Sequence, residues 1–138
     1  MWVMDTDVVV AALRSRQGAS AELVRLALRG EIMLGLSVAM VLEYEEVATR
    51  AEHVDASGLS VEEIVAVIDA LVSVATPIEP HFLWRPQLRD ADDEMVLEAA
   101  VNGGASAIVT FNRRDFELPA RRFGVTVLAP GEALEMVK

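Results

Sequence analysis

The chain has 138 residues, which fits one domain, and 53% of them are hydrophobic, enough for a substantial core. The net charge of −10 argues against a general nucleic-acid coat protein, whose affinity comes from basic side chains that neutralise phosphates. No hydrophobic run reaches the roughly 18 residues of a membrane helix, and without cysteine or a signal peptide the sequence fits a cytoplasmic protein.

The first half of the chain alternates short hydrophobic strands with helices. The expected elements are a strand over 3–5, a segment opening at 8–13, a helix over 19–29, a strand over 32–36 and a helix from 37 to about 50. Gly30 ends the first helix, because glycine is common just past a helix C-terminus. Ser37 has the side chain that commonly caps a helix N-terminus, so it marks the start of the second helix.

The second half continues the alternation after a polar break over 53–58. The expected elements are a helix from Ser60, an edge strand over 76–80, a loop over 81–89 with Trp84 packed on the body, a helix from Asp90 or Asp92 to Gly103–Gly104, strands over 107–110 and 125–128, and a short helix after Pro130. Ser60 and Glu63 have the spacing of a capping box, which supports the first of these helices.

The pattern predicts one α/β domain over residues 1–138. About five strands alternate with helices, and the strands are almost continuously hydrophobic instead of alternating with polar residues. Such strands are typical of a parallel sheet that is covered on both faces.

Acidic residues follow the segments that should form strands. Asp5 and Asp7 come at the end of the first strand, Asp115 follows the strand over 107–110, and four of the five residues in 90–94 are acidic. In an open α/β sheet, ligands bind where the carboxyl ends of the strands meet. Carboxylates that converge there without basic partners repel one another, and a hard cation such as Mg²⁺ relieves the repulsion. The sequence therefore predicts a metal-dependent enzyme that acts on phosphate.

Glu43 joins this set from the predicted helix that begins at Ser37. The buried side of that helix is marked by Val38, Val41, Leu42 and Val47. Glu43 lies at the border of this side, whereas Glu45 and Glu46 are expected in solvent. A solvated acidic face explains at least one of the three glutamates without any function.

The other acids also have structural explanations. Asp5 and Asp7 could form a turn or cap a helix, and the acids of 90–94 favour a helix N-terminus through the helix dipole. The segment 110–116 is harder to explain in this way, because it combines a hydroxyl, an amide, two guanidinium groups and a carboxylate directly after a strand.

Four short motifs, in this order, resemble the PIN-domain nucleases, and more narrowly the VapC-like toxins of bacterial toxin–antitoxin pairs. They are D-T-D at 5–7, E-Y at 43–44, D-x-x-D at 90–93 and T-x-N-x-x-D-F at 110–116. The likeness covers the chain from Met1 to about Leu128. It implies a three-layer α/β/α sandwich with a central, mainly parallel sheet, and endoribonuclease activity that depends on Mg²⁺ or Mn²⁺.

Carried over by position, the resemblance implies a role for each motif residue. The implied catalytic, metal-binding acids are Asp5, Glu43, Asp93 and Asp115. The implied supporting residues are Thr6, Asp7, Asp90, Thr110 and Asn112, and the implied contacts to substrate phosphates are Arg113 and Arg114. The family usually has Asn in place of Asp7, and many members have an acid in place of Asn112. The second departure leaves open whether Asp115 contacts the metal directly or through water.

The resemblance also implies a mechanism and partners. A metal held by Asp5, Glu43 and Asp93 would lower the pKa of a bound water that attacks the RNA phosphate. Asp115 would bind a second ion or orient that water. The expected protein partners are an antitoxin, which inserts a basic side chain among the acids, and a second copy of the chain in a homodimer. The helices over 37–50 and 60–74 are the predicted dimer surface.

Two other functions fit parts of the sequence. The run D-T-D-V-V-V from Asp5 also fits the opening motif of haloacid-dehalogenase-type phosphatases, in which the first Asp is the nucleophile. Those enzymes generally use a basic residue, usually Lys, deeper in the chain, whereas the only lysine here is Lys138. The other alternative is a catalytically silent PIN-like binding module, but its unused acids would merely destabilise the fold.

Overall fold

The computed structural model describes every residue except 80, 82–87 and 89, so the predicted packing of Trp84 lies outside the described residues. The described residues form five short strands and eight helices. In chain order they are β1 (Trp2–Met4), α1 (Thr6–Arg14), α2 (Ala19–Leu28), β2 (Gly35–Leu36), α3 (Val38–Ala48), α4 (Ala51–Ser57), α5 (Val61–Val74), β3 (Thr76–Pro77), α6 (Ala91–Gly103), β4 (Ala107–Val109), α7 (Arg113–Arg122), β5 (Thr126–Leu128) and α8 (Pro130–Met136).

All strand pairings among the described residues are parallel. Strands β1, β4 and β5 form one ladder, β2 and β3 form another, and a single bridge between Trp2 and Leu34 joins the two. The spatial order is therefore β3-β2-β1-β4-β5. The chain builds outward from β1 to β3 on one side and then returns to place β4 and β5 on the other. The order of the strands thus reverses between β1 and β4, which is where ligands bind in such sheets.

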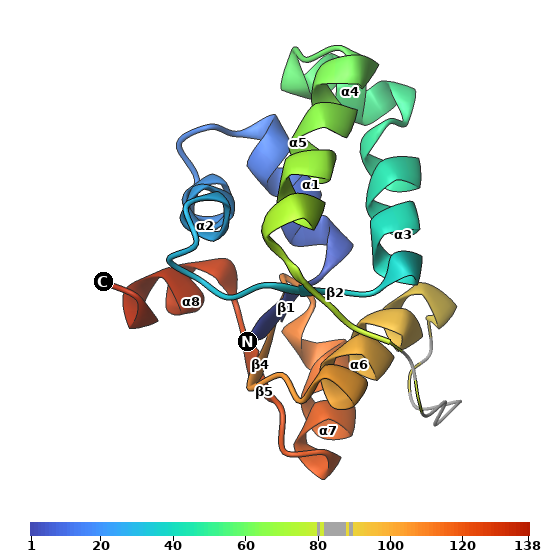
Figure 1. Ribbon diagram of the computed structural model, residues 1–138, viewed down its shortest axis with the longest axis vertical. Helices are drawn as coiled ribbons and strands as arrows, with labels where there is room; N and C mark the ends of the chain where they lie inside the picture. The colour runs from blue at the N-terminus through green and yellow to red at the C-terminus, as the bar shows by residue number, and fades with distance from the viewer. Residues whose placement is uncertain (80, 82–87, 89) are drawn as a thin grey trace.

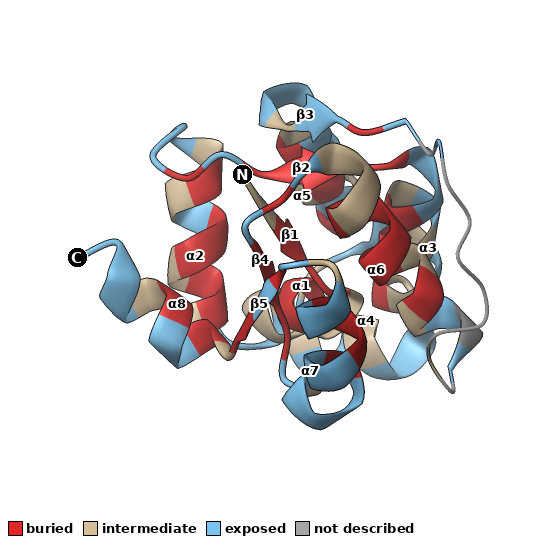
Figure 2. Ribbon diagram, turned by 90° about the horizontal axis from the view of Figure 1, so that it is seen from below, coloured by how far each residue is buried: buried red, intermediate tan, exposed pale blue. Residues whose placement is uncertain are grey.

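Helices cover both faces of the strands, as predicted for a three-layer α/β/α fold. Helices α1, α3 and α5 lie above the strands in Figure 1, and α6 and α7 lie below them. Helix α8 returns to pack against α2. Figure 2 shows the strands β1, β4 and β5 buried, while the outer surface of α7 is exposed. None of the described helices has both the length and the apolar character needed to span a membrane.

Several helix boundaries follow the predicted capping residues. Ser37 Oγ accepts a hydrogen bond from Met40 N at 3.2 Å at the start of α3. Ser60 and Glu63 form the reciprocal capping box of α5. Asp90 caps the start of α6. The helix ends at Gly103 and is capped by Gly104, whose φ of 66° is one that glycine adopts without a steric penalty. Polar side chains at these ends therefore satisfy backbone donors that a helix leaves unpaired.

Two predictions about helices are wrong. The predicted polar break over 53–58 instead forms most of helix α4, which ends at Ser57 and is capped by Gly58. No element is predicted over 117–124, whereas helix α7 runs from Arg113 to Arg122. Helix α7 contains Pro119, a residue that normally interrupts helices. Its apolar side is defined by the spacing of Phe116, Pro119 and Ala120, all of which are buried.

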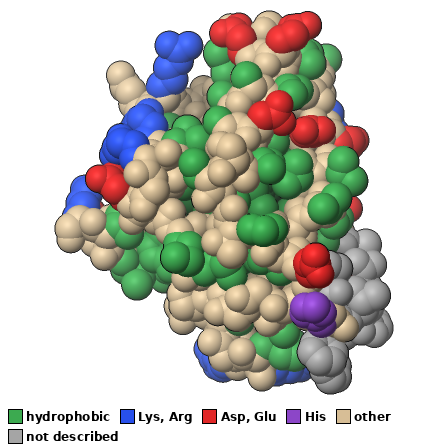
Figure 3. Space-filling model, in the orientation of Figure 1, with side chains coloured by type: hydrophobic (Ala, Val, Ile, Leu, Met, Phe, Trp, Pro, Cys, Tyr) green, Lys and Arg blue, Asp and Glu red, His purple; other side chains and the backbone are tan. Residues whose placement is uncertain are grey.

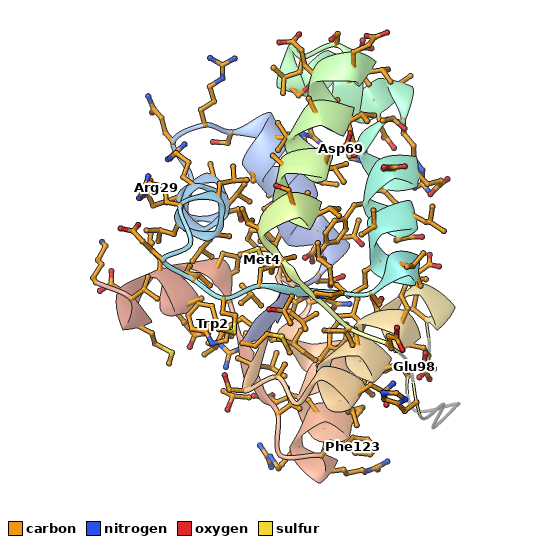
Figure 4. The ribbon with its side chains drawn as sticks, in the orientation of Figure 1. Trp2, Met4, Arg29, Asp69, Glu98 and Phe123 are labelled. Atoms are coloured by element: carbon orange, nitrogen blue, oxygen red, sulfur yellow. The ribbon has the colours of Figure 1, made fainter. Side chains whose placement is uncertain are left out.

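The predicted buried face of α3 is wrong in part. Val38 and Leu42 are 76% and 60% exposed, whereas Val41 and Val47 are partly buried against the core. The buried residues are Met40, Tyr44 and Ala48, four apart along the helix. The Tyr44 hydroxyl donates a hydrogen bond to the carbonyl oxygen of Met4, near the centre of the molecule in Figure 4. This buried contact fixes α3 beside the end of β1, and it sets the direction in which Glu43 points.

Candidate metal centre

Asp5 lies at the reversal point of the sheet, directly after β1, and is 6% exposed. Its Oδ1 accepts from the backbone N of Thr6 at 2.8 Å, which caps α1. Its Oδ2 accepts from the hydroxyl of Thr110 at 2.7 Å, across the boundary between β1 and β4. Burial raises the pKa of Asp5, and these two hydrogen bonds partly oppose that rise because they stabilise the carboxylate.

Asp7 turns toward the same strand end from the first turn of α1. Its Oδ2 accepts from the backbone N of Phe111 at 3.2 Å, but its Oδ1 is buried and has no hydrogen-bond partner among the described residues. Burial, and then the charge of Asp5, raise the pKa of Asp7 from 3.8 to about 7. A buried carboxylate oxygen without a donor is costly unless a cation, a proton or a water satisfies it.

Asp93 approaches from the first turn of α6. The side-chain amide of Asn112 donates to Asp93 Oδ2 at 3.4 Å and to Asp115 Oδ2 at 2.9 Å, so one amide bridges two acids. Burial raises the pKa of Asp93 to about 7, with further contributions from the charges of Asp5, Asp90 and Asp115. The N-terminal ends of α6 and α7 therefore face the same acidic region as the end of β1.

Glu43 is the acid of this group that comes from α3. Its carboxyl group is half-buried, and its pKa is raised first by burial and then by the charges of Asp92 and Glu46. The neighbouring Glu45 does not line the cleft that these acids share. Glu46 is ion-paired with Arg50 at 2.8 Å on the exposed side of α3.

The acids open into a single cleft of about 640 Å³. Its lining comprises Asp5, Thr6, Asp7, Val10, Ala11, Arg14, Ser15, Glu43, Val47, His53, Asp92, Asp93, Phe111 and Asn112. Three of the four predicted catalytic acids thus share one cleft, together with Thr6, Asp7 and Asn112. Thr110 is fully buried behind Asp5.

The remaining predicted residues lie outside this lining. Asp115 is exposed and is connected to Asp93 through Asn112. Asp90 is exposed and caps α6 with a hydrogen bond from Asp92 N at 2.9 Å. Arg113 is ion-paired with Glu132 at 3.0 Å and with Glu117 at 3.7 Å. Arg114 is exposed on the first turn of α7. The phosphate-binding roles of both arginines stay predictions.

The motifs give no role to the other residues of the lining, among which Arg14, His53 and Asp92 carry charged or titratable side chains and Phe111 carries an aromatic ring. His53 has no apparent partner in the sequence, yet in the structure it lies 3.4 Å from Arg14. The helical period of α1 could have indicated that Arg14 faces the cleft. Asp7, Val10 and Arg14 are three and four residues apart, and that spacing places them on one face of a helix.

The cleft supplies the oxygen ligands that Mg²⁺ prefers. The unpartnered Oδ1 of Asp7 is an atom that a cation or its water would satisfy. Among the described residues, however, no three His, Asp or Glu side chains stand close enough to hold one ion together. Mg²⁺ usually keeps several waters and takes only one or two carboxylates, so the donor set fits such an ion without a three-acid cage.

A parallel α/β fold with an acidic cleft at its strand reversal defines the structural class of this protein. The sequence matches the family model of the PIN domain over residues 2–114. The match covers most of the chain, so the protein belongs to the PIN-domain family, and the family predicted from the motifs is confirmed.

The fold is also similar to a solved structure. It matches a chain in the crystal structure of VapBC2 from Rickettsia felis bound to a DNA fragment from their promoter. The TM-score is 0.59 at 12% sequence identity, and the match covers 93% of this chain and 97% of that chain. At this identity the likeness concerns the fold alone. A search of curated proteins finds no match to the sequence.

Proposed function

We propose that this protein is a metal-dependent endoribonuclease that hydrolyses internal phosphodiester bonds of RNA. The observation that supports the proposal is the meeting of Asp5, Asp93 and Glu43 in one cleft of a PIN-domain chain. The pKa of each is raised by burial and by neighbouring carboxylates. Mutual repulsion among these carboxylates lowers the stability of the fold, and a bound divalent cation would relieve that repulsion.

Asp5 and Asp93 would hold Mg²⁺ or Mn²⁺, and Glu43 would bind the ion directly or through one of the waters that the ion keeps. When bound, the ion would supply Lewis-acid activation of the scissile phosphate and of the attacking water. Asp115 is placed to act through Asn112, since the Asn112 amide contacts both Asp93 and Asp115. This arrangement supports an indirect role for Asp115 and leaves its predicted direct ligation for the experiment to test.

The other residues of the site would orient the acids. Thr110 and the backbone N of Thr6 hold the two oxygens of Asp5 in place. The Asn112 backbone N donates to Thr110 Oγ at 2.9 Å, which fixes the direction of that hydroxyl. Asp7 would exchange between its protonated and charged forms in the metal-free protein near neutral pH, because its pKa is raised to about 7. Metal ligands commonly depend on such supporting contacts for their geometry.

The test is cleavage of a labelled RNA oligonucleotide with Mg²⁺, with Mn²⁺ and with EDTA. We expect internal cuts that require the cation and are lost in Asp5→Asn. Glu45→Gln is the matched control, because it also converts an acid to an amide on the same domain but lies outside the cleft lining. RNA that stays intact while a generic phosphomonoester is hydrolysed would overturn the proposal and favour the phosphatase alternative. Loss of cleavage in Glu45→Gln but not in Glu43→Gln would contradict the assigned cleft.

We further propose that the nuclease is the toxin of a toxin–antitoxin pair and acts in the cytoplasm. The similar solved structure belongs to a VapBC2 complex, which supports the idea without identifying a partner here. An inhibitor could place an Arg or Lys among Asp5, Glu43 and Asp93, neutralising the carboxylates in place of the cation. The net charge of −10 would speed the approach of a basic segment.

Expression of the chain alone tests the toxin proposal. We expect the parent to arrest growth and Asp5→Asn to permit it. Equal growth of both cultures, with active nuclease recovered from the parent lysate, would remove the toxin assignment and leave the nuclease proposal intact. High Mn²⁺ should weaken a purified antitoxin complex, since the ion and the basic side chain would compete for the same acids.

A homodimer through α3 and α5 is proposed as well. Val38 and Leu42 on α3, and Val72 and Val74 on α5, are exposed hydrophobic residues. Hydrophobic side chains lie across the face where these helices run in Figure 3, with acidic side chains at its upper end. Light scattering should show a dimer that Leu42→Arg dissociates and Leu118→Arg, on exposed α7 surface, does not. A monomeric parent would contradict the dimer.

A further inference from the structure

The cleft has a second end, away from the acids. One face of α1 forms its floor, beginning with Asp7 and continuing through Val10 and Ala11 to Arg14. Val47 of α3 also lines it. At a rise of about 1.5 Å per residue, Arg14 lies roughly 13 Å along the helix from Asp5. The Arg14 guanidinium lies beside His53 of α4, so we take a group bound at Arg14 to be a different part of a ligand from the phosphate at the acids.

Arg14 is the sole Lys or Arg among the described residues that line the cleft. Its Nη1 lies 3.4 Å from Nδ1 of His53, which comes from α4. Because a guanidinium can only donate, Nδ1 accepts this contact and the ring proton of neutral His53 lies on Nε2. His53 Nε2 faces Glu52 Oε1 at 3.8 Å. The histidine side chain is 17% exposed, so it holds the arginine from a nearly enclosed position.

The middle of the cleft is apolar. Val10, Ala11 and Val47 lie between the acidic end and Arg14, and Phe111 lines the cleft with 57% of its surface exposed. Exposed aromatic and apolar surface suits the faces of unpaired bases, while a guanidinium suits a phosphate. From one end of the cleft to the other, the lining therefore changes from carboxylates to apolar surface and then to one cationic side chain.

We propose that Arg14, positioned by His53, binds a phosphate of the RNA at least one nucleotide away from the scissile phosphate, with the intervening base against Val10 and Val47. This inference rests on the proposed nuclease function and adds a binding residue to it. The acids act on one phosphate, whereas Arg14 supplies the local positive charge that a domain of net charge −10 otherwise lacks in this cleft. A purely structural Arg14 would instead stabilise the C-terminal end of α1 through the helix dipole.

The test uses the inactive Asp5→Asn protein and a fluorescein-labelled single-stranded RNA. Binding is followed by anisotropy between about 50 and 200 mM salt, a range over which affinity from phosphate contacts falls steeply. Arg14→Gln is expected to weaken binding roughly tenfold. It should also lower the slope of log affinity against log salt by about 0.7, the value for one phosphate contact on a single strand. Arg121→Gln, outside the cleft on α7, removes the same charge and should leave the slope unchanged.

Two further variants separate binding from folding. Arg14→Lys should restore the salt slope, because the charge returns, while recovering only part of the affinity. His53→Ala should weaken binding in the presence of Arg14 and have no further effect in Arg14→Gln, since the histidine acts through the arginine. Thermal melts of each variant confirm that the fold is kept.

The outcomes are distinguishable. An unchanged slope in Arg14→Gln, equal to that of Arg121→Gln, would overturn this inference alone, provided that the parent protein cleaves RNA. A parent protein that neither binds nor cleaves RNA would overturn the inference together with the proposed function.

Discussion

The acids in and beside the cleft come from two kinds of position, and their surroundings differ. Asp5 and Asp7 follow strand β1, where Asp5 is buried and both of its oxygens accept hydrogen bonds. Asp92 and Asp115 lie in the first turns of α6 and α7 and are exposed. Exposed acids at helix N-termini are stabilised by the dipole and screened by water. Asp5, with both oxygens hydrogen-bonded, is therefore the fixed acid of the site, and the exposed Asp92 and Asp115 are its adjustable acids. Asp93 is half-buried and electrostatically strained like Asp7, because the pKa of each is raised to about 7.

The largest expected effect comes from comparing Asp5→Asn with Asp115→Asn. Asp5→Asn should lower single-turnover RNA cleavage by about 100-fold or more, since it removes a preorganised charge at the reacting centre. Asp115→Asn should cost about tenfold, the lower range for a residue that supports a ligand. Quenched-flow cleavage with saturating Mn²⁺ measures both. Equal losses in the two variants would remove the distinction between fixed and adjustable acids.

Thr110→Val tests whether the fixed acid, Asp5, depends on its hydrogen bonds. The substitution keeps the volume but leaves Asp5 Oδ2 without the 2.7 Å donor. We expect about 1–2 kcal/mol of lost stability, the usual cost of an unsatisfied buried group, and roughly tenfold slower cleavage. Urea unfolding and the cleavage assay measure the two effects. Full activity in Thr110→Val would show that the position of Asp5 is set by the backbone alone.

Asp7→Asn tests the electrostatic strain directly. Because the pKa of Asp7 is raised from 3.8 to about 7, its contribution to stability is fully present below pH 3.8. That contribution is lost as the pH rises through about 7, where the buried carboxylate becomes charged. The pKa of Asp93 is also raised to about 7, so this group lowers the stability of the metal-free protein over the same pH range.

Without metal, Asp7→Asn should therefore be more stable than the parent at pH 8, by about 1–2 kcal/mol after allowance for solvent screening. The two proteins should converge at pH 4. Thermal melts in EDTA across this range provide the measurement, and Glu45→Gln serves as the control. A parent protein whose stability rises between pH 5 and 8 relative to Asp7→Asn would have the opposite sign and contradict the account.

The smallest expected effects are on Mn²⁺ affinity, and they should differ between the two α3 glutamates, Glu43 and Glu45. Glu43→Gln should weaken Mn²⁺ binding by about tenfold, because Glu43 lines the cleft. Glu45→Gln should leave metal affinity unchanged, since Glu45 lies outside the lining. Isothermal titration of Mn²⁺ into each variant decides the matter. If Glu45→Gln alone changed the affinity for Mn²⁺, the face of α3 that is assigned to the metal would be the wrong one.

The strand pattern and the motifs could be predicted because each depends on local sequence. Hydrophobic segments gave the five parallel strands, and acids directly after strands indicated the carboxyl end of the sheet. Ser37, Ser60 and Asp90 marked helix starts because the capping hydrogen bonds lie within one turn. Such contacts need no knowledge of distant parts of the chain.

The errors lie where packing overrides the local pattern. Apolar residues occur on two sides of α3, and the buried side is selected by Tyr44, whose hydroxyl reaches a carbonyl 40 residues away. Helix α4 contains no fully buried residue, so its sequence has no hydrophobic period to indicate a helix. The pair of Arg14 and His53 is 39 residues apart, and only the packing of α1 against α4 brings it together.

The most direct test of the central claim is the position of Mn²⁺ in crystals of the parent protein soaked with the ion. We expect an anomalous peak in the cleft, about 2.1 Å from carboxylate oxygens of Asp5 and Asp93, with Glu43 bound directly or through water. The peak should be absent from crystals of Asp5→Asn. A peak only at the exposed acids of α6 and α7, or no peak at saturating Mn²⁺, would contradict the assignment of the metal centre to the end of β1.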